Sequence, residues 1–560
     1  MKKYDVIVVG GGIAGLRSAI ESAKKVDTAI ISQVHPLRSH TLAAQGGVNA
    51  ALGNATPDDS WEKHALDTIK GSDYLADQDA VEIMTKEAIE IIYEMEHWGT
   101  PFSRTSEGKI AQRPFGGAGY PRTCYGADRI GHYLLHTLYE KVVEQKIKIY
   151  SEFLVTDLVL EDGKCVGVIA INILNNEIEA FLAKAVIFAT GGIGRIYGKS
   201  TNSLISSGYG IAIAYEAGVS LKDMEFVQFH PTSLYGTNIL ITEAARGEGG
   251  YLLNSKGERF MKNYAPEKME LAPRDIVARA MQTEINEGRG FENQYLHLDL
   301  RHLGKEKILE RLPEIREISI NFAGIDPIEE PIPVQPCQHY SMGGIDTDKD
   351  GKTKIEGFYA CGECACVSVH GANRLGGNSL LEGLVFGRRA GKSASEYAFG
   401  KEYFGKSTLI ESLREREKKI SELFKKGNKG FGSYIRKKLG EVMHENVGIF
   451  REKNGLEKAQ STIKRLKEIY ETIGIENKEE YNLELVRTLE LDGMLLVAEV
   501  ITLCALKREE SRGSHYRTDF KDRDDKNFLK HSISFFTKEG PKIEYADVFI
   551  DKYKPTERKY

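Results

Sequence analysis

Three glycines near the N-terminus, Gly10, Gly12 and Gly15, are spaced as Gly-x-Gly-x-x-Gly. They stand between a short apolar run at 4–9, typical of a buried parallel strand, and a helical pattern that continues to about Lys25. Glycines at this spacing allow a tight turn and a close approach of a pyrophosphate, while the helix N-terminus presents free N–H groups to the phosphates. The segment therefore predicts a dinucleotide site. Its expected contacts are Gly10, Gly12, Ile13, Ala14 and Gly15.

One expected part of that site is absent. The acidic residue that binds the ribose about 20 residues later would fall near Ser32, which offers only one hydroxyl group. Either the ribose is held elsewhere or Glu363 supplies the carboxylate, because Glu363 also follows a predicted strand and a glycine.

Bulk composition limits the classes of function. A chain of 560 residues is too long for one core, so several domains are expected. A net charge of −5 argues against a nucleic-acid binder that relies on a broad basic face. The seven scattered cysteines fit a reducing compartment, and Cys361-x-x-Cys364-x-Cys366 lacks a suitably spaced fourth ligand, so no metal site is expected. We find no secretory signal and no run of about 18 apolar residues, so membrane association is expected only through a partner.

The order of predicted elements indicates how the chain is divided. Strand-and-glycine patterns recur at 185–192 and 357–363, which predicts one nucleotide-binding domain interrupted by insertions. Residues 230–344 mix helix and strand patterns and form the expected insertion. From about 405, Lys- and Glu-rich sequence with apolar residues at helical spacing predicts a helical bundle, and a small lobe follows from about 513.

Several longer motifs carry a resemblance to a known family. They lie at 38–41 (Arg-Ser-His-Thr), 44–47 (Ala-Gln-Gly-Gly), 228–232 (Gln-Phe-His-Pro-Thr), 242–250, 273–275 (Pro-Arg-Asp), 339–344, 370–380, 510–515 and 523–525. In type and order they resemble the succinate dehydrogenase and fumarate reductase flavoprotein subunits, of the FAD-dependent oxidoreductase 2 family, over essentially the whole chain.

The resemblance implies an α/β fold with four parts. A Rossmann-like FAD-binding domain would span 1–229 and 345–404, with an inserted α+β capping domain at 230–344. A helical domain would follow at 405–512 and a small C-terminal domain at 513–560. These limits agree with the division expected from the pattern of elements.

The resemblance also implies the cofactor contacts. His40 would bond covalently, through a ring nitrogen, to the 8α carbon of FAD, and such a tether can raise the flavin potential. The other implied FAD contacts are Ser32, Ser39, Thr41, Gln45, Gly46, Gly47, Thr190, Gly191, Glu363, Arg374, Ser379 and Leu380.

Succinate and fumarate each carry two carboxylates, so their site needs several donors and one proton carrier. By resemblance, His230, Thr242, His339 and Arg374 bind the dicarboxylate, and Phe102 forms an apolar wall. The fork of Arg374 suits a planar carboxylate because it donates two parallel hydrogen bonds. Arg274 is the implied proton donor and acceptor, with Glu243 and Arg246 as its relay to solvent.

A flavin can pass on electrons singly, whereas a dicarboxylate cannot. The resemblance therefore implies an iron–sulfur partner subunit, followed by membrane anchor subunits and a quinone. The chain would lie peripherally on the cytoplasmic side of the inner membrane, held there by these partners, and no nucleic acid is expected.

Other readings stay open. L-aspartate oxidase shares the fold and the active-site arginine but lacks the covalent histidine, so His40 argues against it. A soluble fumarate reductase with another electron donor is a second alternative. A non-enzymatic or RNA-modifying FAD module is a third, although it need not carry the four substrate residues together. Two positions depart from the family pattern: Tyr209 stands where many relatives have Asp, and Phe528 replaces a tryptophan.

Overall fold

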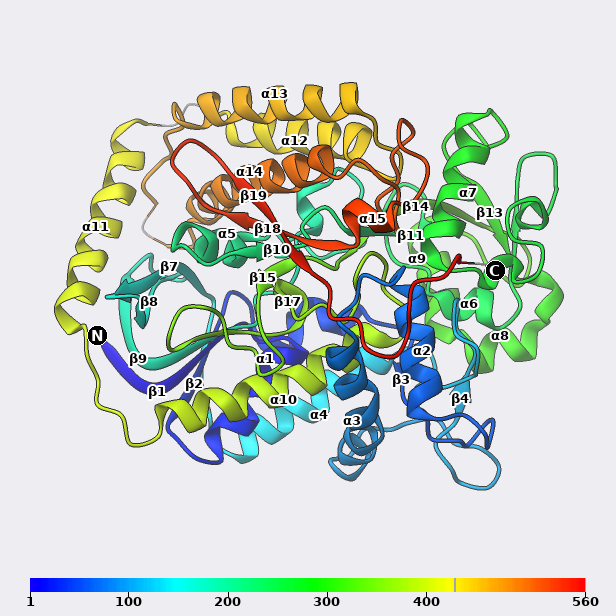
Figure 1. Cartoon of the computed structure of the whole chain (residues 1–560), viewed down its shortest axis with the longest axis horizontal. Helices are drawn as coiled ribbons and strands as arrows, with labels where there is room; N and C mark the ends of the chain where they lie inside the picture. The colour runs from blue at the N-terminus through cyan, green and yellow to red at the C-terminus, as the bar shows by residue number, and fades with distance from the viewer. Residues whose placement is uncertain (428–429, 479, 559–560) are drawn as a thin grey trace.

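The computed structural model describes residues 1–427, 430–478 and 480–558. Its central sheet has seven strands, in the order β6-β2-β1-β9-β8-β7, with β16 paired to β9 (Figure 1). The strands are β1 (Lys2–Val9), β2 (Thr28–Ser32), β6 (Lys148–Ser151), β7 (Phe153–Glu161), β8 (Lys164–Asn172), β9 (Ile178–Phe188) and β16 (Phe358–Ala360). β1 pairs in parallel with β2 and β9, and β16 pairs in parallel with β9. The three predicted strand-and-glycine units therefore meet in one sheet, which confirms the expected α/β fold class.

Two helices that are far apart in the sequence pack tightly against each other beside this sheet. α1 (Ile13–Ala23) meets α10 (Asn378–Ala398), which carries glycine at every fourth position of one face. A Cβ atom at Gly387 would lie 2.8 Å from the carbonyl oxygen of Ala14, and one at Gly391 would lie 2.3 Å from that of Ser18. The missing side chains thus let the two backbones approach. α2 (Trp61–Gly71), α3 (Gln78–His97) and α4 (Ile130–Glu144) also belong to this part of the molecule.

The predicted α+β insertion has its own sheet and core (Figure 1, green). The sheet has the order β11-β14-β13-β12 and is antiparallel throughout. Its strands are β11 (Val227–Leu234), β12 (Tyr251–Leu253), β13 (Leu296–Asp299) and β14 (Ile332–Ser341). Its helices are α6 (Glu243–Gly247), α7 (Arg274–Asn286), α8 (Lys305–Arg311) and α9 (Pro313–Ala323). The predicted limit at 229/230 falls within β11, so this strand is shared between the two parts.

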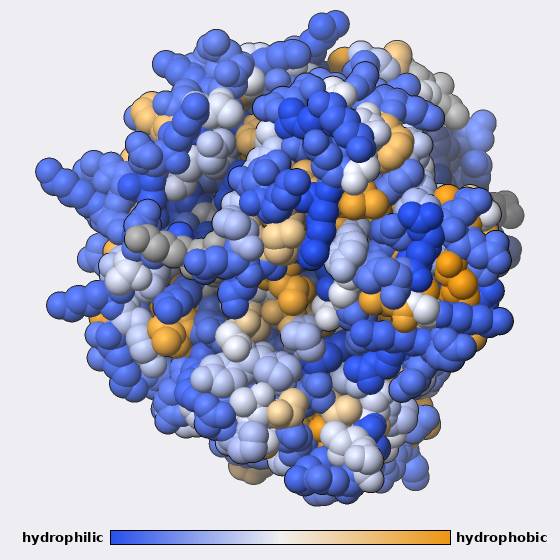
Figure 2. Space-filling view, turned by 90° about the vertical axis from the view of Figure 1, so that its right-hand side faces the viewer, coloured by the Kyte–Doolittle hydropathy of each residue, from blue (hydrophilic) through white to orange (hydrophobic). Residues whose placement is uncertain are grey.

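Figure 2 views the molecule from the side of this insertion, and the face is mostly hydrophilic with separate apolar patches. Leu309 on α8 and Phe322 on α9 are among the exposed large apolar side chains. No helix in the described part of the chain is both long and apolar enough to cross a membrane.

Four helices follow, as the apolar spacing predicts: α11 (Lys406–Lys425), α12 (Gly432–Asn446), α13 (Lys453–Tyr470) and α14 (Leu483–Lys507). α14 packs against α12, α13 and α5 (Tyr209–Glu216), and buried residues occur on every side of it. It is therefore the central helix of this group.

The C-terminal segment joins a sheet with earlier parts of the chain. β18 (Lys530–Phe535) pairs with β19 (Lys542–Asp547) and with β10 (Leu221–Lys222), within the order β17-β15-β10-β18-β19. The remaining strands here are β15 (Gly344–Asp346) and β17 (Ala365–Cys366). The C-terminal strands β18 and β19 thus extend a sheet that begins with strands from the middle of the chain.

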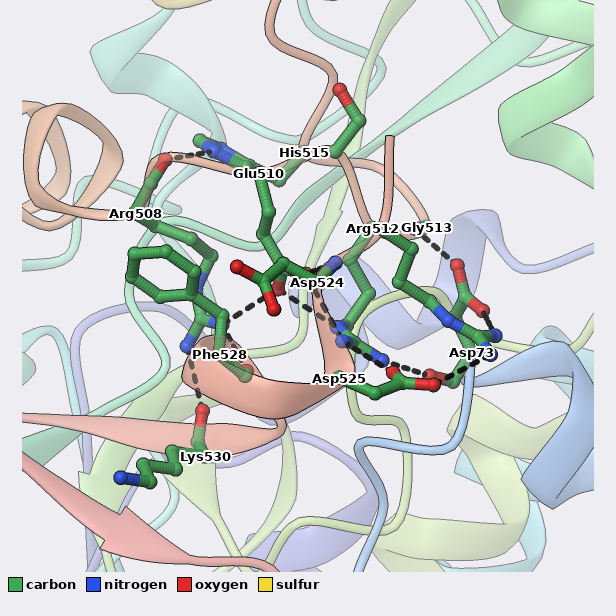
Figure 3. Close-up of polar contacts among 12 residues, drawn as sticks. Asp73, Arg508, Glu510, Arg512, Gly513, His515, Asp524, Asp525, Phe528 and Lys530 are labelled. Carbon is green, nitrogen blue, oxygen red and sulfur yellow. Dashed lines mark hydrogen bonds and ion pairs between the residues drawn. The ribbon is translucent and has the colours of Figure 1, made fainter. Parts of the chain in front are cut away.

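A buried ionic network holds the C-terminal region against the N-terminal part of the chain (Figure 3). Glu510 accepts hydrogen bonds from Arg508 and Arg512, and Arg512 also pairs with Asp525 on α15 (Asp525–Phe528). Asp73, which follows α2, accepts from the Gly513 backbone at 2.9 Å. The network therefore ties the region after α14 to the N-terminal part of the chain.

Candidate active site

One cavity of about 480 Å³ collects most of the residues singled out in the sequence. It lies at the carboxyl ends of β1, β2 and β9, where open parallel sheets bind ligands, and the inserted unit contributes the opposite wall. The predicted site residues that line it are Gly10, Gly12, Ile13, Ala14, Ser32, Ser39, His40, Thr41, Gln45, Gly46, Gly47, Thr190, Gly191, His230, Thr242, Glu243, Arg274, His339, Glu363, Arg374, Ser379 and Leu380. Gly15, Arg246 and Phe102 are outside this lining.

The glycine motif shapes the turn after β1. Gly10 has φ +119°, and a Cβ atom there would lie 2.1 Å from the carbonyl oxygen of Ala189. A Cβ atom at Gly15 would lie 2.0 Å from the Gly10 oxygen, so Gly15 serves the packing of helix on strand. At the start of α1, the Ile13 backbone N–H donates to Thr41 Oγ1 at 3.2 Å. This contact joins the helix N-terminus to the segment that contains His40.

His40 opens a 3₁₀ helix (His40–Ala43) and faces the same cavity. Its Nδ1 accepts a hydrogen bond from the Ser203 backbone at 3.3 Å, and its Nε2 lies 3.2 Å from Asn202 Nδ2. Burial, helped by the nearby cation of Arg195, lowers the pKa of His40 to about 4. At neutral pH the imidazole is therefore uncharged and keeps a nucleophilic nitrogen.

Glu363 lies in the cavity wall on the turn after β16. Its Oε1 accepts a hydrogen bond from the Ser341 backbone at 3.0 Å. A Cβ atom at Gly192 would lie 2.2 Å from that oxygen, so the carboxylate depends on a glycine beside it. Burial raises the pKa of Glu363 to about 7. Ser32 lines the cavity as well, so both candidates for the ribose contact reach it.

Besides Arg374 Nε, five side-chain polar atoms in the cavity wall are buried and have no hydrogen-bond partner within the described chain. They are Ser39 Oγ, Gln45 Oε1, Thr190 Oγ1, Asn202 Oδ1 and Ser203 Oγ. Leaving such groups unpaired costs about 1–3 kcal/mol each. A large ligand rich in hydrogen-bonding groups would satisfy them, and together with the glycine turn they fit FAD.

Three charged side chains form a row that leads from the cavity into the inserted unit, in the order Arg274, Glu243 and Arg246. Arg274 Nε donates to Glu243 Oε2 at 2.6 Å, while Glu243 Oε1 accepts from the Gly116 backbone at 2.5 Å. Arg246 Nη2 lies 3.9 Å from Glu243 Oε2. Burial alone would raise the pKa of Glu243, but the two arginines hold it below the usual value. The carboxylate is therefore ionised between two cations.

Four further donors surround the same part of the cavity. The rings of His230 and His339 lie 4.9 Å apart, and burial holds both pKa values well below the usual range. Thr242 caps α6, accepting from the Ala244 backbone through Oγ1. Burial and the nearby Arg274 lower the pKa of Arg374 to about 9, which leaves it charged at neutral pH. The two arginine cations and two neutral histidines face one space, and the only carboxylate among these groups, Glu243, is already paired. The remaining positive charge favours binding of a dianion.

Gln228 links the two arginine segments, a role that the sequence motif did not reveal. Its Oε1 accepts from Arg274 Nη1 at 3.2 Å, and its Nε2 donates to the carbonyl oxygen of Arg374 at 2.8 Å. The side chain is fully buried. Gln228 therefore couples the position of Arg274 on the inserted unit to that of Arg374.

Phe102, expected as an apolar wall of the pocket, is not among the residues that line the cavity. Phe102 packs in the core beside α3 and α4, whereas Phe115 lines the cavity. A Cβ atom at Gly46 would lie 2.9 Å from the Phe115 ring. The sequence signal was the Gly116-Gly117 pair directly after Phe115. In the structure the Gly116 N–H donates to Glu243.

Other singled-out positions have packing or hydrogen-bond contacts of their own in the described chain. Arg246 is buried behind Glu243 and donates to the Glu270 carbonyl oxygen. Tyr209 lines the cavity at the start of α5 and packs against Gly493 of α14. The three clustered cysteines are buried free thiols, and no group of three or more potential ligands suited to a metal ion occurs in the described ranges.

Comparisons with known proteins agree with this geometry. The FAD binding domain family matches residues 5–380, and the fumarate reductase flavoprotein C-terminal family matches residues 436–560. The chain is 46% identical to a succinate dehydrogenase flavoprotein subunit of Rickettsia conorii, over 99% of this chain and 95% of the relative. It is 45% identical to a fumarate reductase flavoprotein subunit of Mycobacterium tuberculosis, over 100% of this chain and 99% of the relative.

Solved structures extend the agreement to the fold. A flavoprotein variant of E. coli quinol fumarate reductase superimposes with a TM-score of 0.95 at 40% identity, covering 100% of this chain and 99% of that one. Because both the identity and the coverage are high, the chain belongs to the succinate dehydrogenase and fumarate reductase flavoprotein subunit family of FAD-dependent oxidoreductases.

Proposed function

We propose that this chain interconverts succinate and fumarate with FAD bound covalently through His40. The observation that carries the proposal is the shared cavity, in which Arg274 with its paired Glu243 faces His230, His339 and Arg374 beside the cofactor-binding turn. Bound FAD would exchange a hydride with the substrate and pass electrons onward one at a time. The protein's own residues would bind and orient the dicarboxylate, exclude water and move one proton.

The two substrate carboxylates would be held by different groups. Arg374 can donate two parallel hydrogen bonds to one carboxylate, and the neutral rings of His230 and His339 can donate to a carboxylate without adding charge. Thr242 supplies a further hydroxyl donor at the helix end. Phe115 closes one side of the space with an apolar surface. This arrangement would fix the substrate geometry before the reaction.

The proton would move at Arg274. Arginine normally stays protonated, so it can act as an acid only if its proton is returned from a neighbour. Glu243 at 2.6 Å from Arg274 Nε provides that neighbour, and Arg246 continues the path behind it. In fumarate reduction a proton would leave the Arg274 guanidinium for the substrate carbon. In succinate oxidation the deprotonated Arg274 side chain would accept a proton from the substrate carbon.

His40 has the chemistry needed for a covalent link. Its Nδ1 is engaged as an acceptor of the Ser203 N–H, which leaves Nε2 as the nitrogen for a bond to carbon. With Nδ1 as the acceptor, the one hydrogen of the neutral ring is on Nε2, and it would leave as a proton when the bond to carbon forms. The low pKa keeps the ring from carrying a second proton.

The electron partners are proposed from the relatives. The solved neighbours include quinol–fumarate reductase with menaquinol and a mycobacterial complex with a quinone. An iron–sulfur subunit would dock near His40, and membrane anchor subunits would lead to a quinone pool. The chain would then lie peripherally on the cytoplasmic side of the inner membrane.

The test uses the purified holoenzyme, precipitated in acid. Yellow flavin should remain with the unaltered protein and be released from His40→Ser. With an artificial dye as electron acceptor, succinate should be oxidised far faster than aspartate. Free flavin from the unaltered protein, together with faster aspartate oxidation, would instead identify an aspartate oxidase.

A further inference from the structure

Behind Arg374 lies a buried chain of three polar side chains that the proposed mechanism does not use. Tyr340, at the end of β14, donates from its hydroxyl to Glu382 Oε2 at 2.5 Å. His370 Nε2 lies 3.0 Å from the same oxygen. The exposed fractions of Tyr340, Glu382 and His370 are 6%, 3% and 3%. Burying a carboxylate this deeply costs free energy unless the group is hydrogen-bonded, and Tyr340 and His370 are the partners of Glu382 here.

Tyr340 connects this chain to the cavity. Its ring lines the cavity next to His339, and the guanidinium carbon of Arg374 lies 4.5 Å from the ring centroid. At that separation the guanidinium makes a cation–π contact with the ring. Arg374 Nε has no hydrogen-bond partner within the described chain. The ring is therefore a principal support for the plane of the guanidinium.

Arg374 needs such support because another cation lies close to it. Burial, and then the charge of Arg274, disfavour its protonated form. A phenol that donates to a carboxylate becomes richer in electrons, and an electron-rich ring attracts a cation more strongly. The carboxylate of Glu382 thus acts on Arg374 through the ring, without entering the cavity.

We propose that Tyr340 and Glu382 are positioning residues for Arg374: Glu382 fixes the phenol, and the phenol holds the guanidinium flat so that its fork faces a substrate carboxylate. The inference rests on the proposed function, because it takes Arg374 as a dicarboxylate ligand. Tyr340 and Glu382 would hold the Arg374 guanidinium in its binding geometry before the dicarboxylate arrives.

The experiment measures binding of malonate, a dicarboxylate without a reactive carbon pair, to the holoenzyme. Binding is followed by the change in flavin absorbance and, independently, by the rise in Tm with malonate. The variants are Tyr340→Leu, Tyr340→Phe and Glu382→Gln. The matched controls are Tyr264→Phe and Glu284→Gln, because Tyr264 donates to the buried Glu284 at 2.7 Å in the inserted unit, outside the cavity lining.

We expect Tyr340→Leu to weaken malonate binding about tenfold, the effect of losing a desolvated cation–π contact. Glu382→Gln and Tyr340→Phe should weaken it less, and KM for fumarate should rise with Kd while kcat changes less. Adding Glu382→Gln to Tyr340→Leu should cause no further loss, because Glu382 acts through the ring. The controls should bind malonate as the unaltered enzyme does.

Equal malonate affinity in the unaltered enzyme and in all three variants would overturn the positioning role while leaving the proposed function in place. Failure of the unaltered holoenzyme to bind malonate would overturn both. If Tyr340→Leu does not fold, the two conservative variants carry the test, since each keeps the size of the side chain that it replaces.

Discussion

At Arg274 a side chain that is normally a permanent cation meets a buried carboxylate. The Arg274–Glu243 contact of 2.6 Å is closed on its other side by the Gly116 N–H, so Glu243 has little freedom to turn away. In the proposed mechanism, a cation held in this way would lose a proton to the substrate and regain one from a neighbour. The same contact also fixes the orientation of the guanidinium toward the cavity.

Replacing Arg274 should separate chemistry from cofactor binding. We expect Arg274→Ala to lower succinate and fumarate turnover by about 10²–10⁴-fold, the usual contribution of a positioned acid–base group. The flavin content should stay near that of the unaltered protein, because Arg274 lies on the inserted unit. Steady-state rates and the ratio of flavin to protein absorbance measure the two effects.

The control for that variant is Arg289→Ala, since Arg289 pairs with Glu284 on the inserted unit and is outside the cavity lining. It should retain normal turnover. Near-normal turnover of Arg274→Ala would refute the assigned acid–base role.

Among the secondary-structure elements, the turn from β1 into α1 tolerates the least change. A Cβ atom at Gly15 would lie 2.0 Å from the Gly10 oxygen, and the conflict is with backbone rather than with a flexible side chain. We expect Gly15→Ala to reduce the free energy of unfolding by about 1–3 kcal/mol, as overpacking does. Flavin content should fall as well, because the phosphate turn moves. Thermal unfolding and flavin absorbance report both.

Gly432→Ala is the matched control for this substitution. Gly432 begins α12, and a Cβ atom there would meet no atom within 4 Å. Alanine is the better helix former, so stability should stay equal or rise slightly. A similar loss in both variants would argue against a specific clash at Gly15.

β18 carries a histidine whose protonation should affect stability. His531 Nδ1 lies 2.7 Å from Asp223 Oδ2, and its Nε2 lies 3.2 Å from Asp77 Oδ1. Burial opposes the charged form, but the two carboxylates prevail and raise the pKa of His531 to about 9. Because this folded-state pKa exceeds the unfolded value, the stabilisation is full below about pH 6.5 and is lost as pH rises through about 9.

We therefore expect the free energy of unfolding to fall by up to about 3 kcal/mol between pH 6.5 and pH 9.5 through this group. Urea unfolding at a series of pH values measures the fall. In His531→Gln the pH dependence over this range should be smaller, and an unchanged dependence would show that other groups cause it.

At the scale of the whole molecule, the C-terminal network holds distant segments together. Glu510 is fully buried and accepts from Arg508, Arg512 and the Asp524 backbone (Figure 3). Removing one partner of a buried ion pair typically costs about 3–5 kcal/mol, because the opposite charge is left unpaired. We expect Glu510→Ala to lose stability by about this amount in thermal or urea unfolding. Its exposed neighbour offers the control: Glu509→Ala should change stability little.

The sequence by itself determined the local elements and the order of the parts. The apolar run before Gly10 and the helical pattern after it became β1 and α1, and the Lys- and Glu-rich region became four helices. Such features depend on the period of apolar residues and on backbone-permissive glycines, which are properties of neighbouring residues. Motif resemblance added the family, and most of the site residues that it implied line the cavity.

The tertiary structure alone decided the contacts between distant segments. It placed Phe115 rather than Phe102 at the cavity, and it brought Glu363 to the wall. It also joined β18 to β10 in one sheet and made Gln228 the link between Arg274 and Arg374. These contacts join residues from tens to hundreds of positions apart. They depend on how whole elements pack, which no local pattern specifies.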